Sequence, residues 1–199
     1  MKVVLQQFAR YPRPGQVKTR LLGELSAAEA CAVHGELMQQ TARALCAARL
    51  GPVELWLDEI APHAVIDACQ AAGVSALREQ PAGDLGMRMR HALQDGLGKA
   101  DAVLLVGSDC PGLDVDYLYA AAGALQQASL VLGPAEDGGF VLIGARSTAA
   151  EMFDGVQWGE SGVLQQTRAA FRAVGKTWAE LPERYDIDHP QDLRRWRGT

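Results

Sequence analysis

One carboxylate, Asp109, lies two residues after the end of one of the most apolar stretches of the sequence. That stretch, Val103–Gly107 (VLLVG), is typical of a strand buried on both faces. The next residues, Ser108–Gly112 (SDCPG), end the strand, because proline cannot donate to a sheet ladder. Asp109 is therefore expected at the carboxyl end of a central strand, where open α/β sheets bind their ligands. An aspartate there could bind a divalent cation that holds a diphosphate, or it could cap the next helix.

A loop rich in cations, Pro14–Arg20 (PGQVKTR), follows the first predicted strand. Gly15 would let the backbone approach a phosphate, and Lys18 and Arg20 would supply positive charge to it. The alternative is a solvated basic loop. The spacing matches neither the Walker A motif nor the GxGxxG fingerprint, so the residues do not support a P-loop or a Rossmann dinucleotide site here.

Two further loops carry carboxylates beside glycines. In Gly83–Arg88 (GDLGMR), Asp84 could cap a helix or contact a ligand, and capping is the favoured role. In Pro134–Phe140 (PAEDGGF), Glu136 and Asp137 precede paired glycines. That pattern suits a tight turn, and it also suits binding of sugar hydroxyls or a metal.

The C-terminal segment Tyr185–Leu193 (YDIDHPQDL) contains another carboxylate, Asp188. It could cap the helix that Pro190 is suited to begin, or it could reach the cation that Asp109 binds. His189 has no partner at metal-ligand spacing and is expected on the surface. The other histidines lie in predicted helices and receive no functional role: His34, His63 and His91.

The cysteines form no CxxC pair and are expected to be free thiols: Cys31, Cys46, Cys69 and Cys110. Cys110 lies beside the proposed site, but we expect it to fill space rather than act as a nucleophile. Trp158 and Trp178 are expected to pack in the core, although Trp158 falls in a loop and could touch a substrate.

Strands and helices are predicted to alternate along the chain. The predicted strands are Lys2–Phe8, Val53–Asp58, Val74–Arg78, Val103–Gly107, Ser129–Gly133, Phe140–Gly144 and Lys176–Leu181. The predicted helical segments are Thr19–Leu25, Ser26–Arg49, Pro62–Gly73, Leu85–Leu97, Asp114–Gln127, Ser161–Val174 and Pro190–Arg197. This alternation predicts a three-layer αβα sandwich with a mixed, mainly parallel sheet. The link from Gly133 to Phe140 is too short for a helical crossover, so part of the sheet is expected to be antiparallel or shifted to an edge. We expect one domain over residues 1–199.

The composition is that of an ordinary globular protein, with 199 residues, 48% hydrophobic and 22% charged. A net charge of −5 argues against general affinity for nucleic acid or anionic membranes. No apolar run reaches the length of a membrane span, and the N-terminal residues are predicted to form a strand rather than a signal peptide. A cytoplasmic location is therefore expected.

Five motifs in order, PGQVKTRL, GDLGMRM, GSDCPGL, GPAEDGGF and DIDHPQDL, give the chain its resemblance to the DUF2064 family. Its members are glycosyltransferase-A-like proteins, some described as arsenosugar-biosynthesis glycosyltransferases. The resemblance covers essentially the whole chain and implies the fold of nucleotide-diphospho-sugar transferases. That fold is also shared with nucleotidylyltransferases that act on sugar 1-phosphates. The resemblance further implies that a nucleotide is bound through a divalent metal, Mg²⁺ or Mn²⁺.

Residue roles follow from the resemblance motif by motif. Asp109 and Asp188 would bind the metal, and Glu136 and Asp137 would face the sugar or acceptor as catalytic candidates. The candidates for nucleotide and phosphate binding are Arg10, Gly15, Lys18, Arg20, Gly83, Asp84 and Ser108. Arg10 is included because the first strand ends in QQFAR where relatives have a FAKAP-like sequence. The chain also departs from the family at Trp158, where WGESGV stands in place of WST followed by a variable stretch.

Three functions agree with these residues. The first is transfer of a sugar from a nucleoside diphosphate sugar to a small acceptor, with Glu136 or Asp137 as general base and the metal neutralising the leaving diphosphate. The second is nucleotidylyl transfer from an NTP to a phosphorylated small molecule with release of pyrophosphate. The third is nucleotide binding without catalysis. In each case the partners are small molecules, with neither nucleic acid nor a membrane.

Overall fold

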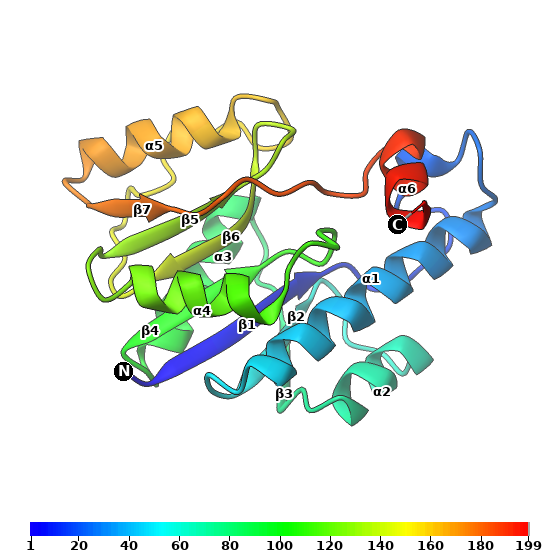
Figure 1. Cartoon of the computed structure of the whole chain (residues 1–199), viewed down its shortest axis with the longest axis horizontal. Helices are drawn as coiled ribbons and strands as arrows, with labels where there is room; N and C mark the ends of the chain where they lie inside the picture. Colours follow the sequence, from blue (N-terminus) through cyan, green and yellow to red (C-terminus); the bar gives the residue numbers. More distant parts are fainter. Residues whose placement is uncertain (199) are drawn as a thin grey trace.

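The computed structural model describes residues 1–198 and consists of a seven-stranded sheet between two layers of helices (Figure 1). The strands are β1 (Val3–Ala9), β2 (Val53–Leu57), β3 (Ala76–Glu79), β4 (Ala102–Val106), β5 (Leu130–Pro134), β6 (Phe140–Ala145) and β7 (Trp178–Glu180). The helices are the 3-10 turn η1 (Thr19–Leu21), α1 (Ala27–Ala48), α2 (Ala64–Ala71), α3 (Leu85–Leu97), α4 (Val115–Ala124), α5 (Val163–Ala173) and α6 (Pro190–Arg197). The predicted fold class is confirmed.

The strands follow the order β3-β2-β1-β4-β6-β5-β7. The strand β6 runs antiparallel to both of its neighbours, β4 and β5, while the other neighbouring pairs are parallel. The prediction from the short link between Gly133 and Phe140 is therefore confirmed, because β5 and β6 form an antiparallel pair joined by that turn. This order brings the carboxyl ends of β1 and β4 side by side.

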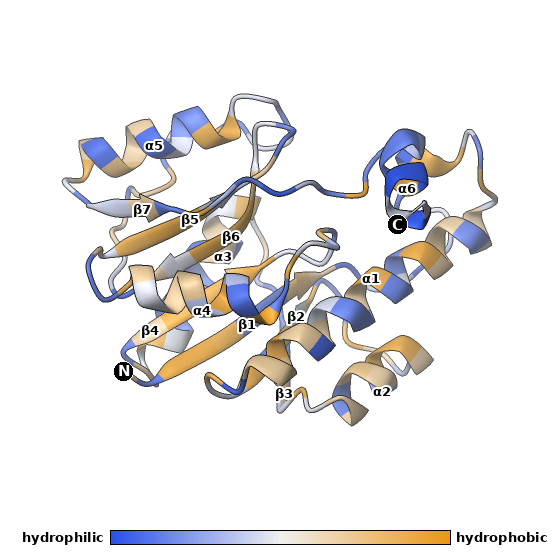
Figure 2. Ribbon diagram, in the orientation of Figure 1, coloured by the Kyte–Doolittle hydropathy of each residue, from blue (hydrophilic) through white to orange (hydrophobic). Residues whose placement is uncertain are grey.

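Both faces of the sheet are apolar, as expected for strands covered on both sides. Residues of α1, α2 and α4 pack with one face, and residues of α3 and α5 pack with the other. Figure 2 shows the strands as mostly hydrophobic ribbon, in contrast to the hydrophilic helix α6. None of the helices formed by residues 1–198 combines the length and the apolar character needed to cross a bilayer.

Helix ends follow the capping signals of the sequence. Ser26 begins α1 with a complete capping box to Glu29, and Asp84 begins α3 by accepting a hydrogen bond from the Met87 amide. Pro190 is the first residue of α6. After β7 the chain crosses to the N-terminal end of α1, where α6 lies (Figure 1). This C-terminal crossing carries Asp186 and Asp188.

Candidate active site

Asp109 lies in the loop after β4, at the edge of the sheet that the sequence predicts. The neighbouring Ser108 fixes this loop to β1, since its hydroxyl donates to the Phe8 carbonyl (2.8 Å) and accepts from the Gln7 amide nitrogen (2.9 Å). Ser108 is buried, with both hydrogen bonds made inside the protein. The side chain of Ser108 therefore helps to position the loop that carries Asp109. The family resemblance instead implies that Ser108 binds phosphate.

The C-terminal crossing brings two more carboxylates to Asp109. The Ile187 amide donates to the Asp109 carbonyl (2.9 Å), which joins the crossing to the β4 loop. Ile187 itself is fully buried in a cluster with Leu21 and Leu37. Because side chains alternate in an extended segment, Asp186 and Asp188 lie on the side opposite to Ile187. There they line a cavity of about 570 Å³, which is the main cavity.

The ammonium of Lys18 lies between the two aspartates that were predicted to bind a metal. Its Nζ is 2.7 Å from Asp109 Oδ1, 3.3 Å from Asp188 Oδ1 and 2.6 Å from the Ile187 carbonyl oxygen. Arg20 pairs with the other oxygen of Asp188 at 2.7 Å. Four residues from three distant segments of the sequence therefore form one charged cluster at the sheet edge.

This cluster fits a divalent cation. Two carboxylates and a backbone carbonyl already surround a single cation, and oxygen donors are the ligands that Mg²⁺ and Mn²⁺ prefer. Within residues 1–198, no three His, Cys, Asp or Glu side chains gather into a metal-binding group. The protein would thus supply two carboxylates, Asp109 and Asp188, and phosphate oxygens would complete the coordination, as is usual for magnesium–nucleotide sites.

Asp186 is a site residue for which the sequence analysis proposed no role. Burial raises its pKa from 3.8 to about 8, and the negative charges of Asp109, Asp137 and Asp188 act in the same direction. Asp186 is therefore mostly protonated at neutral pH and can donate a hydrogen bond from its carboxyl group. The alternation Asp-Ile-Asp around a buried isoleucine is the signal that could have identified it.

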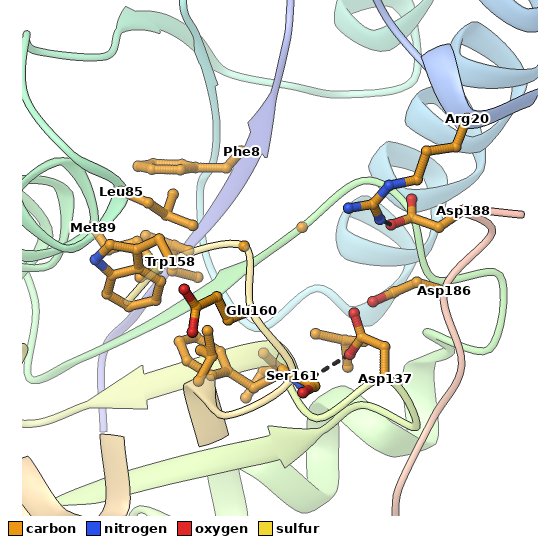
Figure 3. Close-up of a pocket in the computed structure, with 18 of the residues that line it drawn as sticks. Phe8, Arg20, Leu85, Met89, Asp137, Trp158, Glu160, Ser161, Asp186 and Asp188 are labelled. Carbon is orange, nitrogen blue, oxygen red and sulfur yellow. Dashed lines mark hydrogen bonds and ion pairs between the residues drawn. The ribbon is translucent and has the colours of Figure 1, made fainter. Parts of the chain in front are cut away.

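A cavity of about 570 Å³ opens beside the charged cluster. Figure 3 shows that its two ends differ: Asp137, Asp186, Asp188 and Arg20 lie at one end, and an apolar group lies at the other. The apolar end is lined by Phe8, Leu85, Met89 and Trp158, and the lining residue Phe140 packs edge-on against Trp158. Glu160 lies between the two ends in Figure 3. The size suits a small-molecule ligand.

Asp137 reaches this cavity from the turn between β5 and β6. Its Oδ1 accepts a hydrogen bond from the Gly139 amide (2.8 Å), which fixes the carboxylate in the turn. Gly138 has a φ of 87°, and a Cβ there would lie 2.0 Å from the Ser161 carbonyl oxygen. Only glycine allows this close approach, which holds the turn against the opposite wall of the cavity.

The neighbouring Glu136 is directed elsewhere. It forms an exposed two-point ion pair with Arg195 of α6, at 2.8 and 3.1 Å, and it does not line the cavity. Of the two predicted catalytic candidates, the structure therefore places Asp137 at the cavity and Glu136 on the outside.

Of the seven candidates for nucleotide and phosphate binding, Arg20 lines the main cavity and the other six do not. Lys18 and Ser108 lie beside Asp109, as described above, and the remaining four lie elsewhere. Arg10 lines a separate polar hollow of about 110 Å³, and Gly15 lies in an exposed turn with a φ of 78°. The carboxylate of Asp84 caps α3 (2.8 Å), and the Gly83 carbonyl accepts from the Arg88 guanidinium (2.9 Å). The structure thus gives Asp84 the capping role that the sequence favoured.

Two buried side chains complete the surroundings of Asp109. His34 of α1 has its Nδ1 3.9 Å from Asp109 Oδ1, and its Nε2 donates to the Arg10 carbonyl (2.9 Å). Burial lowers the pKa of His34, which keeps the ring neutral. Burial also raises the pKa of the Cys110 thiol to about 12, which agrees with a space-filling role rather than a nucleophilic one.

The seven-stranded mixed sheet and its acidic edge site define an α/β protein with the fold of nucleotide-diphospho-sugar transferases. The chain belongs to the DUF2064 family, described as "Uncharacterized protein conserved in bacteria", whose model matches residues 41–160. The predicted family is thereby confirmed, and the matched range contains three of the five motifs, namely GDLGMRM, GSDCPGL and GPAEDGGF. No curated protein matches the chain.

The structure is similar to a crystal structure from Desulfovibrio desulfuricans G20 described as a "putative nucleotide-diphospho-sugar transferase". The two share 30% sequence identity with a TM-score of 0.86, over 98% of this chain and 86% of the other.

More distant structures share the fold alone. CMP:2-keto-3-deoxy-manno-octonic acid synthetase complexed with CTP has 14% identity and a TM-score of 0.63, over 100% of this chain and 98% of the other. The manganese complex of Rv0371c from Mycobacterium tuberculosis H37Rv has 14% identity and a TM-score of 0.51, over 100% of both chains.

Proposed function

We propose that this protein transfers a sugar from a nucleoside diphosphate sugar to a small acceptor, with Mg²⁺ or Mn²⁺ bound by Asp109 and Asp188. The observation that carries the proposal is the cluster of two aspartates and two cations, Lys18 and Arg20, beside a cavity of about 570 Å³. Such a cluster offers both parts of a diphosphate site, namely carboxylates for a metal and cations for phosphate oxygens.

In this proposal each residue has one task. An acceptor hydroxyl attacks the anomeric carbon of the sugar, the bond from that carbon to the diphosphate oxygen breaks, and Asp137 takes the hydroxyl proton. The diphosphate leaves with its negative charge, which Lys18 and Arg20 stabilise. A divalent cation held by Asp109 and Asp188 would supply further positive charge for the same leaving group. Asp186, which is mostly protonated at neutral pH in the metal-free protein, is the group that would donate a hydrogen bond to an oxygen of the bound sugar or acceptor.

The charges of the cavity favour an acceptor without a phosphate group. Its lining includes four carboxyl groups, those of Asp137, Glu160, Asp186 and Asp188, while Arg20 is the one lysine or arginine among its described lining residues. A phosphorylated acceptor would be repelled by the carboxylates and would need further cations to bind. The apolar end around Trp158 suits a flat or aliphatic part of the acceptor.

Nucleotidylyl transfer is the second candidate. Lys18 and Arg20 both lie against Asp188, an arrangement that would also suit an NTP whose α-phosphate is attacked by a phosphorylated substrate. The distant similarity to a synthetase complexed with CTP agrees with this candidate. A third possibility, nucleotide binding without catalysis, would give binding but no product.

A thermal-shift panel with NTPs, NDPs and NDP-sugars, each with Mn²⁺, Mg²⁺ or EDTA, tests the proposal, because a ligand of the folded state raises the melting temperature. Sugar transfer predicts metal-dependent stabilisation by one NDP and its sugar conjugate. Incubation of that conjugate with candidate acceptors should then release the NDP. Stabilisation by an NTP but not by its sugar conjugate, with pyrophosphate release, would instead establish nucleotidylyl transfer.

A further inference from the structure

Lys18 makes its contacts in the position that a divalent cation would take. Its ammonium touches Asp109 Oδ1, Asp188 Oδ1 and the Ile187 carbonyl oxygen within 3.3 Å, and only 4% of its side chain is exposed. The buried Asp109 Oδ1 receives no aligned hydrogen bond, although it lies 2.7 Å from Lys18 Nζ. The contact is an ion pair of the kind that a spherical cation could replace.

The backbone holds Lys18 in this place. Lys18 has the left-handed conformation, with φ 50° and ψ 38°, and Arg49 is the other non-glycine residue with positive φ within residues 1–198. This conformation is unfavourable for a residue with a Cβ. It is compensated by the three oxygen contacts that the side chain makes at the start of η1.

The charges around Lys18 require a cation at this point. The ammonium of Lys18 lies between the carboxylates of Asp109 and Asp188 and forms an ion pair with each of them. Without a cation between them, the two aspartates would repel each other. Arg20 pairs with Asp188 from the solvent side and does not contact Asp109.

We infer that Lys18 occupies the metal position of the free protein and that a divalent cation binds Asp109 and Asp188 only when Lys18 moves away from them. The free protein then has low affinity for the metal alone. An arriving diphosphate gives the ammonium new oxygen partners, so that its transfer to the phosphate leaves both carboxylates to the metal. This inference rests on the proposed metal-dependent function and adds the coupling of metal binding to diphosphate binding.

The two roles of Lys18 predict different effects of its removal on metal binding. If Lys18 were only a phosphate ligand, its removal would leave affinity for metal alone unchanged. If it occupies the metal position, its removal strengthens metal binding, because the competing cation is gone. Linkage between two sites commonly changes affinity by about tenfold or more.

The test is titration of Mn²⁺ alone, without nucleotide, by electron paramagnetic resonance of free Mn²⁺. We expect the affinity of Lys18→Met for Mn²⁺ to be higher than that of the wild type by about tenfold or more. Lys18→Arg keeps the positive charge, so we expect its affinity for Mn²⁺ to stay as low as that of the wild type. The matched control is Lys99→Met, because Lys99 also bridges two carboxylates, Glu54 and Asp95, away from the cavity. Equal or weaker Mn²⁺ binding by Lys18→Met would overturn the inference.

A second measurement uses the wild-type protein and so does not depend on the folding of a variant. Acetylation of lysines by an activated ester, read by mass spectrometry, is expected to be slow at Lys18 and to become faster with saturating Mn²⁺, while Lys99 stays unchanged. Unaltered labelling of Lys18 in the metal-bound protein would mean that the metal binds without displacing it.

The experiments can reject the proposed function and the displacement of Lys18 independently of each other. Tighter Mn²⁺ binding by Lys18→Met without any product from NDP-sugars would support the inference and reject sugar transfer. Mn²⁺-dependent sugar transfer by the wild type, with no gain of Mn²⁺ affinity in Lys18→Met, would reject the inference alone.

Discussion

Gly86 lies directly beneath the indole of Trp158. A Cβ at Gly86 would lie 2.9 Å from Trp158 Cζ2 and 3.0 Å from Phe153 Cβ. The ring of Trp158 also meets Phe140 and Phe153 edge-on, with centroids 6.2 and 5.7 Å apart. Because Gly86 has no side chain, Trp158 can pack against the first turn of α3, and this contact sets the position of the aromatic wall of the cavity.

The variant Gly86→Ala should displace Trp158. Overpacking costs about 1–3 kcal/mol, while alanine gains at most about 1 kcal/mol over glycine in a helix, so we expect a net loss of about 1 kcal/mol. Urea denaturation measures this loss, and the emission of Trp158 should shift. In a Trp158→Phe background the emission change should disappear. An unchanged spectrum of Gly86→Ala would show that the indole does not rest on Gly86.

Asp137 and Glu136 offer a matched pair of variants. Asp137→Asn should lower the turnover of sugar transfer by about 100-fold or more, the usual contribution of a general base, with binding of the NDP-sugar preserved. Glu136→Gln should turn over at nearly the wild-type rate, because Glu136 pairs with Arg195 outside the cavity. Steady-state rates and thermal shifts with the NDP-sugar measure both effects. Equal losses in the two variants would contradict the assignment of the base.

Asp109→Asn tests the metal site. The amide keeps the shape of the side chain but loses the charge that a divalent cation needs. We expect no metal-dependent rise in melting temperature with nucleotide, and a fold that is retained by circular dichroism. The control is Asp67→Asn on α2, because Asp67 takes no part in the ion pairs that join Lys18 and Arg20 to Asp109 and Asp188. A metal-dependent rise of wild-type size in Asp109→Asn would place the metal elsewhere.

Local signals in the sequence predicted most helices and strands and the fold class. The apolar run Val103–Gly107 predicted β4, Ser26 predicted the start of α1, and Pro190 predicted the start of α6. The short turn before Phe140 correctly predicted antiparallel pairing. The position of β6 between β4 and β5 could not be predicted, because pairing of distant strands depends on tertiary packing rather than on local pattern.

The site was predicted in part. The motifs named Lys18, Asp109 and Asp188, and the structure brings these three residues together. Arg10 and Asp84 were named by the same reasoning, yet Asp84 caps a helix and Arg10 lies at a separate hollow. A motif fixes which residues follow a strand, but the direction of each side chain depends on the local hydrogen bonds of its loop.

Asp186 makes the stability of the metal-free protein depend on pH. Its pKa is 3.8 when exposed and about 8 in the fold, so between these values the folded state binds more protons than the unfolded state. Stability therefore falls as the pH rises from about 4 to about 8, and it levels off above that range. The loss arises because the ionised carboxylate is buried among Asp109, Asp137 and Asp188.

The variant Asp186→Asn removes the ionisable group while keeping its size. Its free energy of unfolding, from urea denaturation in EDTA, should exceed that of the wild type by more at about pH 9 than at about pH 5. Other titrating groups, such as His34, are common to both proteins and cancel in this difference. A difference that stays constant with pH would mean that Asp186 is ionised in the fold. In that case it could not donate the hydrogen bond that the proposed mechanism gives it.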